Sequence, residues 1–407
     1  MDQNSSAAPE SAAKKKKHLP LIISLAAVVT VLAALYIFRH GIINLLTKPT
    51  LDPDANEVVH STVKDTSESE PPETEPDTHT EDVYNLLICG HDRVADNTDV
   101  NLLISFNTTK MTASVMQIPR DVNATFAPYT DGYIRPIVNG IFGICKDADS
   151  SDEYIQRRMD KYERGSDLRG IAGFAAYLER NLCVKIHYFG VMDLSQFANI
   201  VDALGGVEMD VPYDLKYDDG DQNLHIDVKQ GRQILDGATA EQIVRFRSGY
   251  ANADLGRGNV QKMFMASLVK TVQSKTNIFN AGKIAKVCGI IADNLVTNMT
   301  TSDLIYFANN AMTLDMRYVT FMTMPIGGYF DEAKGTWYSC LNKEGTLKYI
   351  NNYFNVYKNP VAPEEFDSNG VFYLDSYWYW GPSANITEYI YTGAEMTEEG
   401  FKPVVGY

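Results

Sequence analysis

The segment "VYNLLICGHDRVADNTDVNLLISFN" (83–107) holds two apolar runs separated by a short polar stretch. Each run has the length and composition of a buried strand. A third run, "TASVMQIP" (112–119), ends directly before Arg120. Three strands joined by short loops predict an α/β sheet. Asp92, Asp99 and Arg120 then lie at or near strand ends, where the sites of such sheets commonly lie.

The sequence beyond these strands alternates helical and extended patterns. Apolar positions recur with helical spacing at 168–183 and 194–204. "GGVEMDVP" (205–212) predicts a turn into another strand, and the polar, aspartate-rich segment 213–230 predicts an exposed loop.

An arginine-bearing segment follows. Asp236 is a suitable N-cap for a short helix over "GATAEQIV" (237–244). The next residues, "RFR", are expected to run extended, which would put Arg245 and Arg247 on one side of the backbone and Phe246 on the other.

"RGNVQKMFMASLVKTVQS" (257–274) predicts an amphipathic helix. Its expected apolar stripe consists of Val260, Phe264, Leu268 and Val272. Arg257 and Gln261 stand four residues apart in the first turns, hence on one face. The N-terminus of a helix favours anions through its free N–H groups and its dipole.

The charge balance restricts the partners. The chain has 52 acidic against 36 basic residues, a formal net charge of −16, so a broad basic face for nucleic acid is not expected. Any anion site must be local. Arg245, Arg247 and Arg257 could form a fork for an oxyanion, and structural salt bridges to nearby carboxylates are the alternative.

The N-terminal region predicts a membrane anchor. A basic run, Lys14 to Lys17, precedes twenty uncharged residues, Leu19–Phe38, long enough to span a bilayer. The lysines place the N-terminus in the cytoplasm and the rest of the chain outside. The expected parts are a cytoplasmic tail (1–17), a transmembrane helix (18–39), an acidic extracellular linker (40–82), a catalytic or binding domain (83–334) and an aromatic-rich extension (335–407).

The five cysteines are scattered and show no metal-ligand spacing. Cys89, Cys183 and Cys288 stand among apolar neighbours and are expected to be buried free thiols.

Six sequence blocks, in order, resemble the LytR-CpsA-Psr family of cell-envelope proteins over about residues 84–330. They are "GHDRVADNTDV", "QIPRD", "IVNGIF" around Asn139, "VDALGGV" (201–207), "LDGATAEQIVRFR" and "DLGRGNVQK". The resemblance implies a three-layer α-β-α fold with a mixed central sheet. It also implies transfer of a glycopolymer from an undecaprenyl-pyrophosphate carrier to a hydroxyl of peptidoglycan, forming a phosphodiester.

The same resemblance implies roles for individual residues. Arg120, Arg245, Arg247, Arg257 and Gln261 would bind the lipid pyrophosphate. Asp92 and Asp99 would hold Mg²⁺, which prefers hard oxygen ligands. Asp92 or Asp121 would accept the proton of the attacking hydroxyl, and the sequence does not choose between them.

The sequence departs from the family pattern at two places. Asn97 replaces an arginine of the first block, and Val260 and Lys262 replace an arginine and a glutamine of the last. Arg93, Arg135 or Lys262 would be the compensating cations. The alternatives are a catalytically weak binder of lipid pyrophosphate or envelope polymer, and a hydrolase of the carrier, with only indirect effects on transcription.

Two apolar sets have a functional and a structural interpretation. A lipid tunnel or simple core would be formed by Phe189, Phe197, Ile200, Val201, Phe264, Met265 and Leu268. The extension contains Trp337, Trp378 and Trp380, which would either pack as core or stack on sugar rings.

Overall fold

The computed structural model of the 407-residue chain describes residues 47–51, 80, 82–93, 95–122, 124, 137–219, 224–246, 253–275, 281–331, 336–368 and 390–402. The expected membrane span (18–39) and most of the expected linker lie outside these residues. Among the residues described, no helix combines the length and the apolar character needed to cross a membrane.

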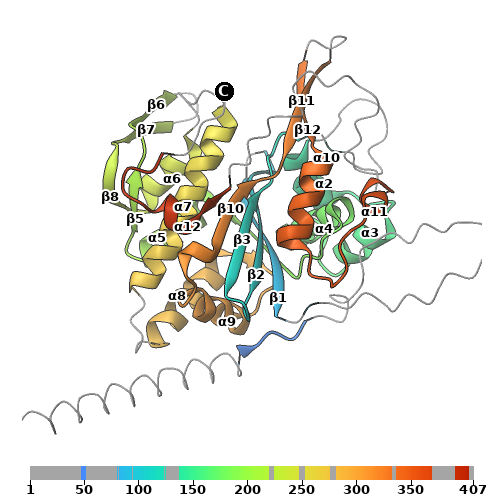
Figure 1. Cartoon of the computed structure of the whole chain (residues 1–407), viewed down its shortest axis with the longest axis horizontal. Helices are drawn as coiled ribbons and strands as arrows, with labels where there is room; N and C mark the ends of the chain where they lie inside the picture. Colours follow the sequence, from blue (N-terminus) through green and yellow to red (C-terminus); the bar gives the residue numbers. More distant parts are fainter. Residues whose placement is uncertain are drawn as a thin grey trace, which may run out of the picture. The chain divides into compact units, whose positions relative to one another are not determined.

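A mixed β-sheet forms the centre of the fold (Figure 1). Its order, among the residues described, is β13 (Tyr391–Thr392), β10 (Val319–Thr323), β3 (Thr112–Gln117), β2 (Asn97–Asn107), β1 (Val83–Asp92), β4 (Tyr188–Asp193) and β9 (Val296–Thr297). The pairs β3–β10 and β1–β4 are parallel, and the other neighbours are antiparallel. The two strands expected within 83–107 and the third expected at 112–119 are confirmed as β1, β2 and β3.

Side chains that alternate along the strands divide the core into two layers. On β1, Leu87 joins the cluster on one face and Leu86 the cluster on the other; on β4, Phe189 and Tyr188 divide in the same way. Helices cover both faces (Figure 1). The three-layer arrangement around a mixed sheet is therefore confirmed.

The helices on the first face, which carries Leu87, come from two stretches of the chain, 141–182 and 343–368. Together they contribute α2 (Ile141–Asp147), α3 (Glu153–Met159), α4 (Asp167–Leu182), α10 (Lys343–Tyr349), a π-helical segment (Ile350–Phe354) and α11 (Pro363–Ser368). A 3₁₀ turn, Val138–Gly140, leads into α2.

The second face is covered by the middle of the chain and by its last described helix. Its helices are α5 (Leu194–Ala203), α6 (Gly237–Arg245), α7 (Ala253–Lys275), α9 (Thr301–Ala311) and α12 (Gly393–Met396), and α8 (Ala281–Asn294) packs on α5 and α9. A second 3₁₀ turn, Met316–Tyr318, precedes β10. The helices expected at 168–183 and 194–204 are confirmed as α4 and α5.

Three two-stranded ribbons lie beside the main sheet in the described part of the chain. They pair β5 (Val207–Val211) with β8 (Gly231–Leu235), β6 (Leu215–Asp219) with β7 (Leu224–Val228), and β11 (Ile326–Asp331) with β12 (Thr336–Leu341). The prediction of an exposed loop at 213–230 is wrong, because most of that segment forms the β6–β7 hairpin. Pairing satisfies the backbone groups of these polar strands.

The expected C-terminal extension packs with the rest of the fold. Residues on both sides of position 334 form one hairpin, β11–β12, and β13 adds an edge to the central sheet beside β10. Tyr349, Ile350 and Phe354 lie in the same buried cluster as Leu87. Trp378 and Trp380 lie outside the described residues. The free, buried state expected for Cys89, Cys183 and Cys288 is confirmed.

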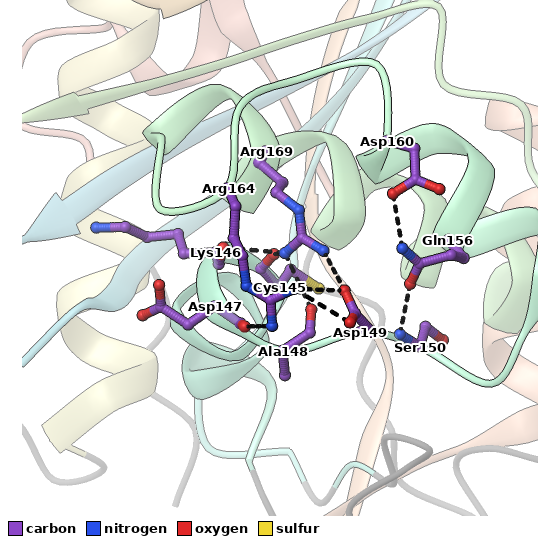
Figure 2. Close-up of polar contacts among 10 residues, drawn as sticks. All are labelled: Cys145, Lys146, Asp147, Ala148, Asp149, Ser150, Gln156, Asp160, Arg164 and Arg169. Atoms are coloured by element: carbon purple, nitrogen blue, oxygen red, sulfur yellow. Dashed lines mark hydrogen bonds and ion pairs between the residues drawn. The ribbon is translucent and has the colours of Figure 1, made fainter.

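A buried arginine closes the C-terminal end of α2. Arg169 on α4 donates to the carbonyl oxygens of Cys145, Lys146 and Ala148 and to the carboxylate of Asp149 (Figure 2). The last carbonyls of a helix have no partner within it, and a cation there is favoured by the helix dipole. Arg169 therefore fixes α2 to α4.

Candidate functional site

A β-bulge shapes the end of the first hairpin. Gly90 on β1 pairs with Val100 on β2, whereas His91 pairs with Thr98, so Asp99 is the extra residue of the bulge. One register step further, Asp92 stands opposite Asn97. Bulges redirect a side chain out of the regular alternation and are frequent beside functional sites. Both carboxylates lie at the same end of the sheet.

Arg120 joins this end of the sheet to the bulge. Its Nη1 donates to Asp99 Oδ1 at 2.6 Å, and the two side chains are 22% and 35% exposed. The carbonyl of Arg120 accepts from the amide of Asn139 at 2.9 Å. The Asn139 block is thereby held against the "QIPRD" block.

Asp121 lies next to Arg120 and near the β12 strand. Its Oδ2 accepts from Ser339 Oγ at 3.5 Å, and Val122 forms a bridge with Ser339. Asp92 and Asp121 both remain candidates for the general base, since each is at the same end of the sheet as Arg120.

A polar network that sequence reasoning missed holds the β1–β2 turn. His91 Nε2 lies 3.0 Å and Lys146 Nζ 2.8 Å from Asp96 Oδ1, and Lys146 also contacts Asp167 at 3.1 Å. Burial alone would raise the pKa of Asp96, but the bonds from Lys146 and His91 outweigh it and lower that pKa. The turn bearing Asp92 is thus attached to α2 and α4.

Helix α7 brings the last family block to the same sheet end. Gly258 packs so closely on β3 that a Cβ there would lie 2.2 Å from Gln117 Oε1. Gln117 Nε2 donates to Gln261 Oε1 at 3.0 Å, and Gln261 Nε2 donates to the Val244 carbonyl at 2.9 Å. Gln117 is the last residue of β3, three positions before Arg120. Arg257, next to Gly258, is buried.

The expected extended backbone at Arg245 is wrong. Arg245 is the last residue of α6, one turn after Glu241, with which it forms an ion pair at 3.2 Å. The backbone becomes extended only at Phe246, which is buried. The predicted N-cap, Asp236, is confirmed, since its side chain accepts from the amide of Thr239. Arg247 lies outside the described residues.

The three cations that were expected to compensate for Asn97 and Val260 differ in their surroundings. Arg93 is exposed and contacts Asp193 at 2.5 Å, and Arg135 lies outside the described residues. Lys262 is fully buried on α7, and its Nζ donates to Thr323 Oγ1 at 2.6 Å. Of the two cations that the structure describes, Lys262 lies at the ends of β3 and β10, where α7 meets the sheet, and Arg93 does not.

Comparison with known proteins agrees with this arrangement. A family model described as the LytR_cpsA_psr family matches residues 53–353. The chain belongs to the LytR_cpsA_psr family. The motifs joined in space by the Asp99–Arg120 and Gln117–Gln261 contacts are those that carried the resemblance.

Two relatives illustrate the range of similarity within the LytR_cpsA_psr family. The cell wall biosynthesis protein LcpA of Corynebacterium glutamicum is 28% identical over 252 residues, 61% of this chain and 46% of that protein. The polyisoprenyl-teichoic acid–peptidoglycan teichoic acid transferase TagV of Bacillus subtilis is 23% identical over 209 residues, covering 50% and 46%. The chain spans about half the length of the curated relatives it matches.

The fold is also shared with solved members of the family. The crystal structure of Bacillus subtilis TagV aligns with a TM-score of 0.52 at 19% identity, over 66% of this chain and 94% of that one. At this identity the likeness concerns the fold.

Two of the residues that depart from the LytR_cpsA_psr pattern, Asn97 and Val260, lie in different parts of the fold. Asn97 begins β2, and its Oδ1 lies 3.9 Å from where a Cβ on Gly140 would be. Val260 is fully buried in the apolar cluster of the second face. A guanidinium at position 260 would have to enter that cluster.

The seven apolar candidates for a lipid tunnel do not all lie together. Phe189 belongs to the buried cluster on the first face of the sheet. Phe197, Val201, Phe264, Met265 and Leu268 belong to the second face or pack against it, and Ile200 is also buried on α5. The rings of Phe197 and Phe264 are 5.4 Å apart. A tunnel on the second face would not include Phe189.

Proposed function

We propose that the chain transfers a glycopolymer from a polyprenyl-pyrophosphate carrier to a hydroxyl group of peptidoglycan. The observation that carries the proposal is the Gln117–Gln261 contact, which brings α7 with its buried Arg257 to the sheet end where Asp99 binds Arg120. Segments more than a hundred residues apart thus assemble one polar site. The names of the relatives LcpA and TagV support the same class of activity.

The reaction is a displacement at phosphorus. The acceptor oxygen attacks the phosphorus that carries the polymer, a phosphodiester forms, and the bond to the second phosphate breaks to release polyprenyl phosphate. Guanidinium groups suit this step, because two N–H groups of one plane can contact two phosphate oxygens. Arg120 and Arg257 would bind the pyrophosphate, and Asp99 would orient Arg120. Asp92 or Asp121 would accept the hydroxyl proton.

Asp92 and Asp99 fit a magnesium ion that would bind together with the pyrophosphate substrate. They are hard oxygen donors at the same end of adjacent strands. Among the residues described, no group of three or more potential metal-ligating side chains occurs, so the proposed ion would complete its shell with phosphate and water, as Mg²⁺ commonly does. When bound, the ion would neutralise phosphate charge.

The location is part of the proposal. Lys14 to Lys17 and the uncharged run Leu19–Phe38 support a single membrane anchor with the catalytic domain outside the cell. An anchored enzyme would meet a lipid carrier in the membrane and peptidoglycan beyond it.

The test is transfer by the full-length chain from a lipid-linked glycopolymer to peptidoglycan. We expect polymer attached to peptidoglycan with Mg²⁺ present, and loss of that product after chelation. Asp99→Asn should lower the rate by about 10²–10³-fold, since a misplaced Arg120 no longer stabilises developing charge. Asp315→Asn is the control and should leave the rate unchanged, because Asp315 is half-buried and forms its ion pair with the exposed Arg317.

Other outcomes would assign other activities to the same site. Release of carrier phosphate without polymer on peptidoglycan would indicate a hydrolase. Tight binding without turnover would indicate a binding protein, a candidate favoured by the buried position of Val260. Absence of both binding and turnover would contradict the proposed function.

A further inference from the structure

Lys262 is a fully buried lysine whose described partner is a neutral hydroxyl. Its Nζ donates to Thr323 Oγ1 at 2.6 Å. An ammonium group carries three donors, and in the part of the chain that the structure describes no carboxylate forms an ion pair with this one. Such burial is costly for a charged group. A fully buried lysine without a counter-ion calls for a functional explanation.

The position of Lys262 connects it to the proposed site. Thr323 is the last residue of β10 and pairs in parallel with Gln117, the last residue of β3. Ligands of α/β sheets bind beyond the carboxyl ends of parallel strands. Gly258, one helical turn before Lys262, is the residue that packs against Gln117. The face of α7 that carries Lys262 is therefore the face that meets these strand ends.

The electrostatic surroundings leave Lys262 able to gain a charge. Burial lowers its pKa from 10.5 to about 7. β3 and β10 carry no charged residue. The other elements that pack against α7 carry Glu241 and Arg245 (α6), Glu395 (α12), and Glu208 and Asp210 (β5). Burial, and none of these charges, is the cause of the lowered pKa of Lys262. An incoming anion would favour the ammonium form.

We propose that Lys262 is a phosphate-binding residue, whose ammonium contacts an anionic oxygen of the pyrophosphate group bound by Arg120 and Arg257. The proposal rests on the proposed function and adds a residue to its site. Val260 lies in the apolar core, so Lys262 is the cation that this turn of α7 presents to the strand ends. The lysine takes up a proton as the ligand arrives.

Calorimetric binding of geranylgeranyl pyrophosphate to the full-length chain in mild detergent tests the role. Lys262→Met and Lys262→Gln should weaken binding about 10- to 100-fold, the value of a hydrogen bond to a charged group. Lys270→Gln is the matched control on the same helix: its Nζ is exposed and contacts the Thr397 carbonyl, and its affinity should equal that of the wild type.

Proton uptake gives a second readout that needs no variant to fold. Calorimetric titrations in buffers of different ionisation enthalpy measure the protons taken up on binding, after correction for those taken up by the ligand itself. For a group with a pKa near 7, the wild type should take up ~0.9 proton at pH 8 and ~0.1 proton at pH 6. Lys262→Met should lack this uptake. Its thermal midpoint without ligand should match or exceed that of the wild type, because a buried polar amine has been replaced by an apolar side chain of similar length.

The two hypotheses fail in different ways. Wild-type binding with no pH-dependent proton uptake, or with unchanged affinity in both Lys262 variants, would overturn the role of Lys262 and leave the proposed function intact. A wild-type chain that does not bind geranylgeranyl pyrophosphate would overturn both. A lower midpoint with normal affinity in the folded fraction would make Lys262 structural.

Discussion

Arg120 and Lys262 are both basic side chains near the end of β3, and their surroundings differ. An arginine keeps its charge at any physiological pH, so a carboxylate beside it is favourable, and Asp99 lies 2.6 Å away. A lysine can lose its proton, so it tolerates a buried position where Thr323 is its described partner. The choice between the two side chains therefore follows from the availability of a counter-ion.

The pKa of Lys262 predicts how stability depends on pH. Between pH 7 and 10.5 the unfolded chain binds more protons at this residue than the folded chain, so its contribution to stability rises with pH across this window. Lys262→Met should lack the rise. Urea unfolding at pH 7, 8 and 9 measures it, with Lys270→Met as the control. If the free energy of unfolding depended on pH in the same way for the wild type and Lys262→Met, the pKa of Lys262 would not be lowered in the folded protein.

Residue positions near strand ends were predictable, but their exact directions were not. The apolar runs of the opening segment placed Asp92 and Asp99 beside the β1–β2 turn, which the structure confirms. The bulge at Asp99 depends on the register between two strands, and an apolar run alone does not fix register. The Arg120–Asp99 ion pair follows from that bulge and was not foreseen.

At the scale of elements, helix α7 differs most from its prediction. An amphipathic helix was expected, yet residues 256–264 are all buried, polar side chains included. Arg257, Asn259 and Gln261 lie inside because α7 packs against α6, α12 and β5 as well as the sheet. A periodicity argument assigns polar residues to solvent, so it cannot identify polar residues buried for a site.

Two glycines in helices provide a matched test of how α7 is seated. A Cβ on Gly258 would displace Gln117, breaking its bond to Gln261, whereas a Cβ on Gly289 of α8 would meet nothing within 4 Å. Gly289→Ala should therefore stabilise the protein by up to ~1 kcal/mol through helix propensity. Gly258→Ala should destabilise it by ~1–3 kcal/mol and weaken pyrophosphate binding.

Urea unfolding and calorimetry distinguish the two alanine variants. If Gly258→Ala gained stability as Gly289→Ala does, and kept its affinity for geranylgeranyl pyrophosphate, the close approach of α7 to β3 would be unimportant for the site.

For the whole molecule, the main question is how the chain beyond position 334 relates to the family domain. The composition of 335–407 suggested an aromatic extension, and the family model ends at residue 353. In the structure, Leu341, Ile350 and Phe354 complete the buried cluster on the first face of the sheet. Contacts so distant in sequence leave no local pattern, so the composition around position 334 does not reveal that the chain on both sides of it shares one core.

Polar contacts tie the same C-terminal region to β1. Asn85 on β1 donates through Nδ2 to the Phe354 carbonyl at 2.7 Å, and the amide of Thr80 donates to the Val356 carbonyl at 2.6 Å. Asn85 is fully buried, so removal of Phe354 would leave its amide without this acceptor.

A chain ending at residue 334 should therefore fail to fold. It loses this part of the core, the Phe354 carbonyl that accepts from Asn85 on β1, and the strands β13 and β12 that pair with β10 and β11. We expect no cooperative thermal unfolding and no near-ultraviolet dichroism from its aromatic residues. Phe354→Ala in the full chain is the graded control: it should lose ~3–5 kcal/mol in urea yet still unfold cooperatively, since only one core side chain is truncated. A chain of 334 residues that unfolded cooperatively at the wild-type midpoint would instead establish residues 335–407 as a separable appendage.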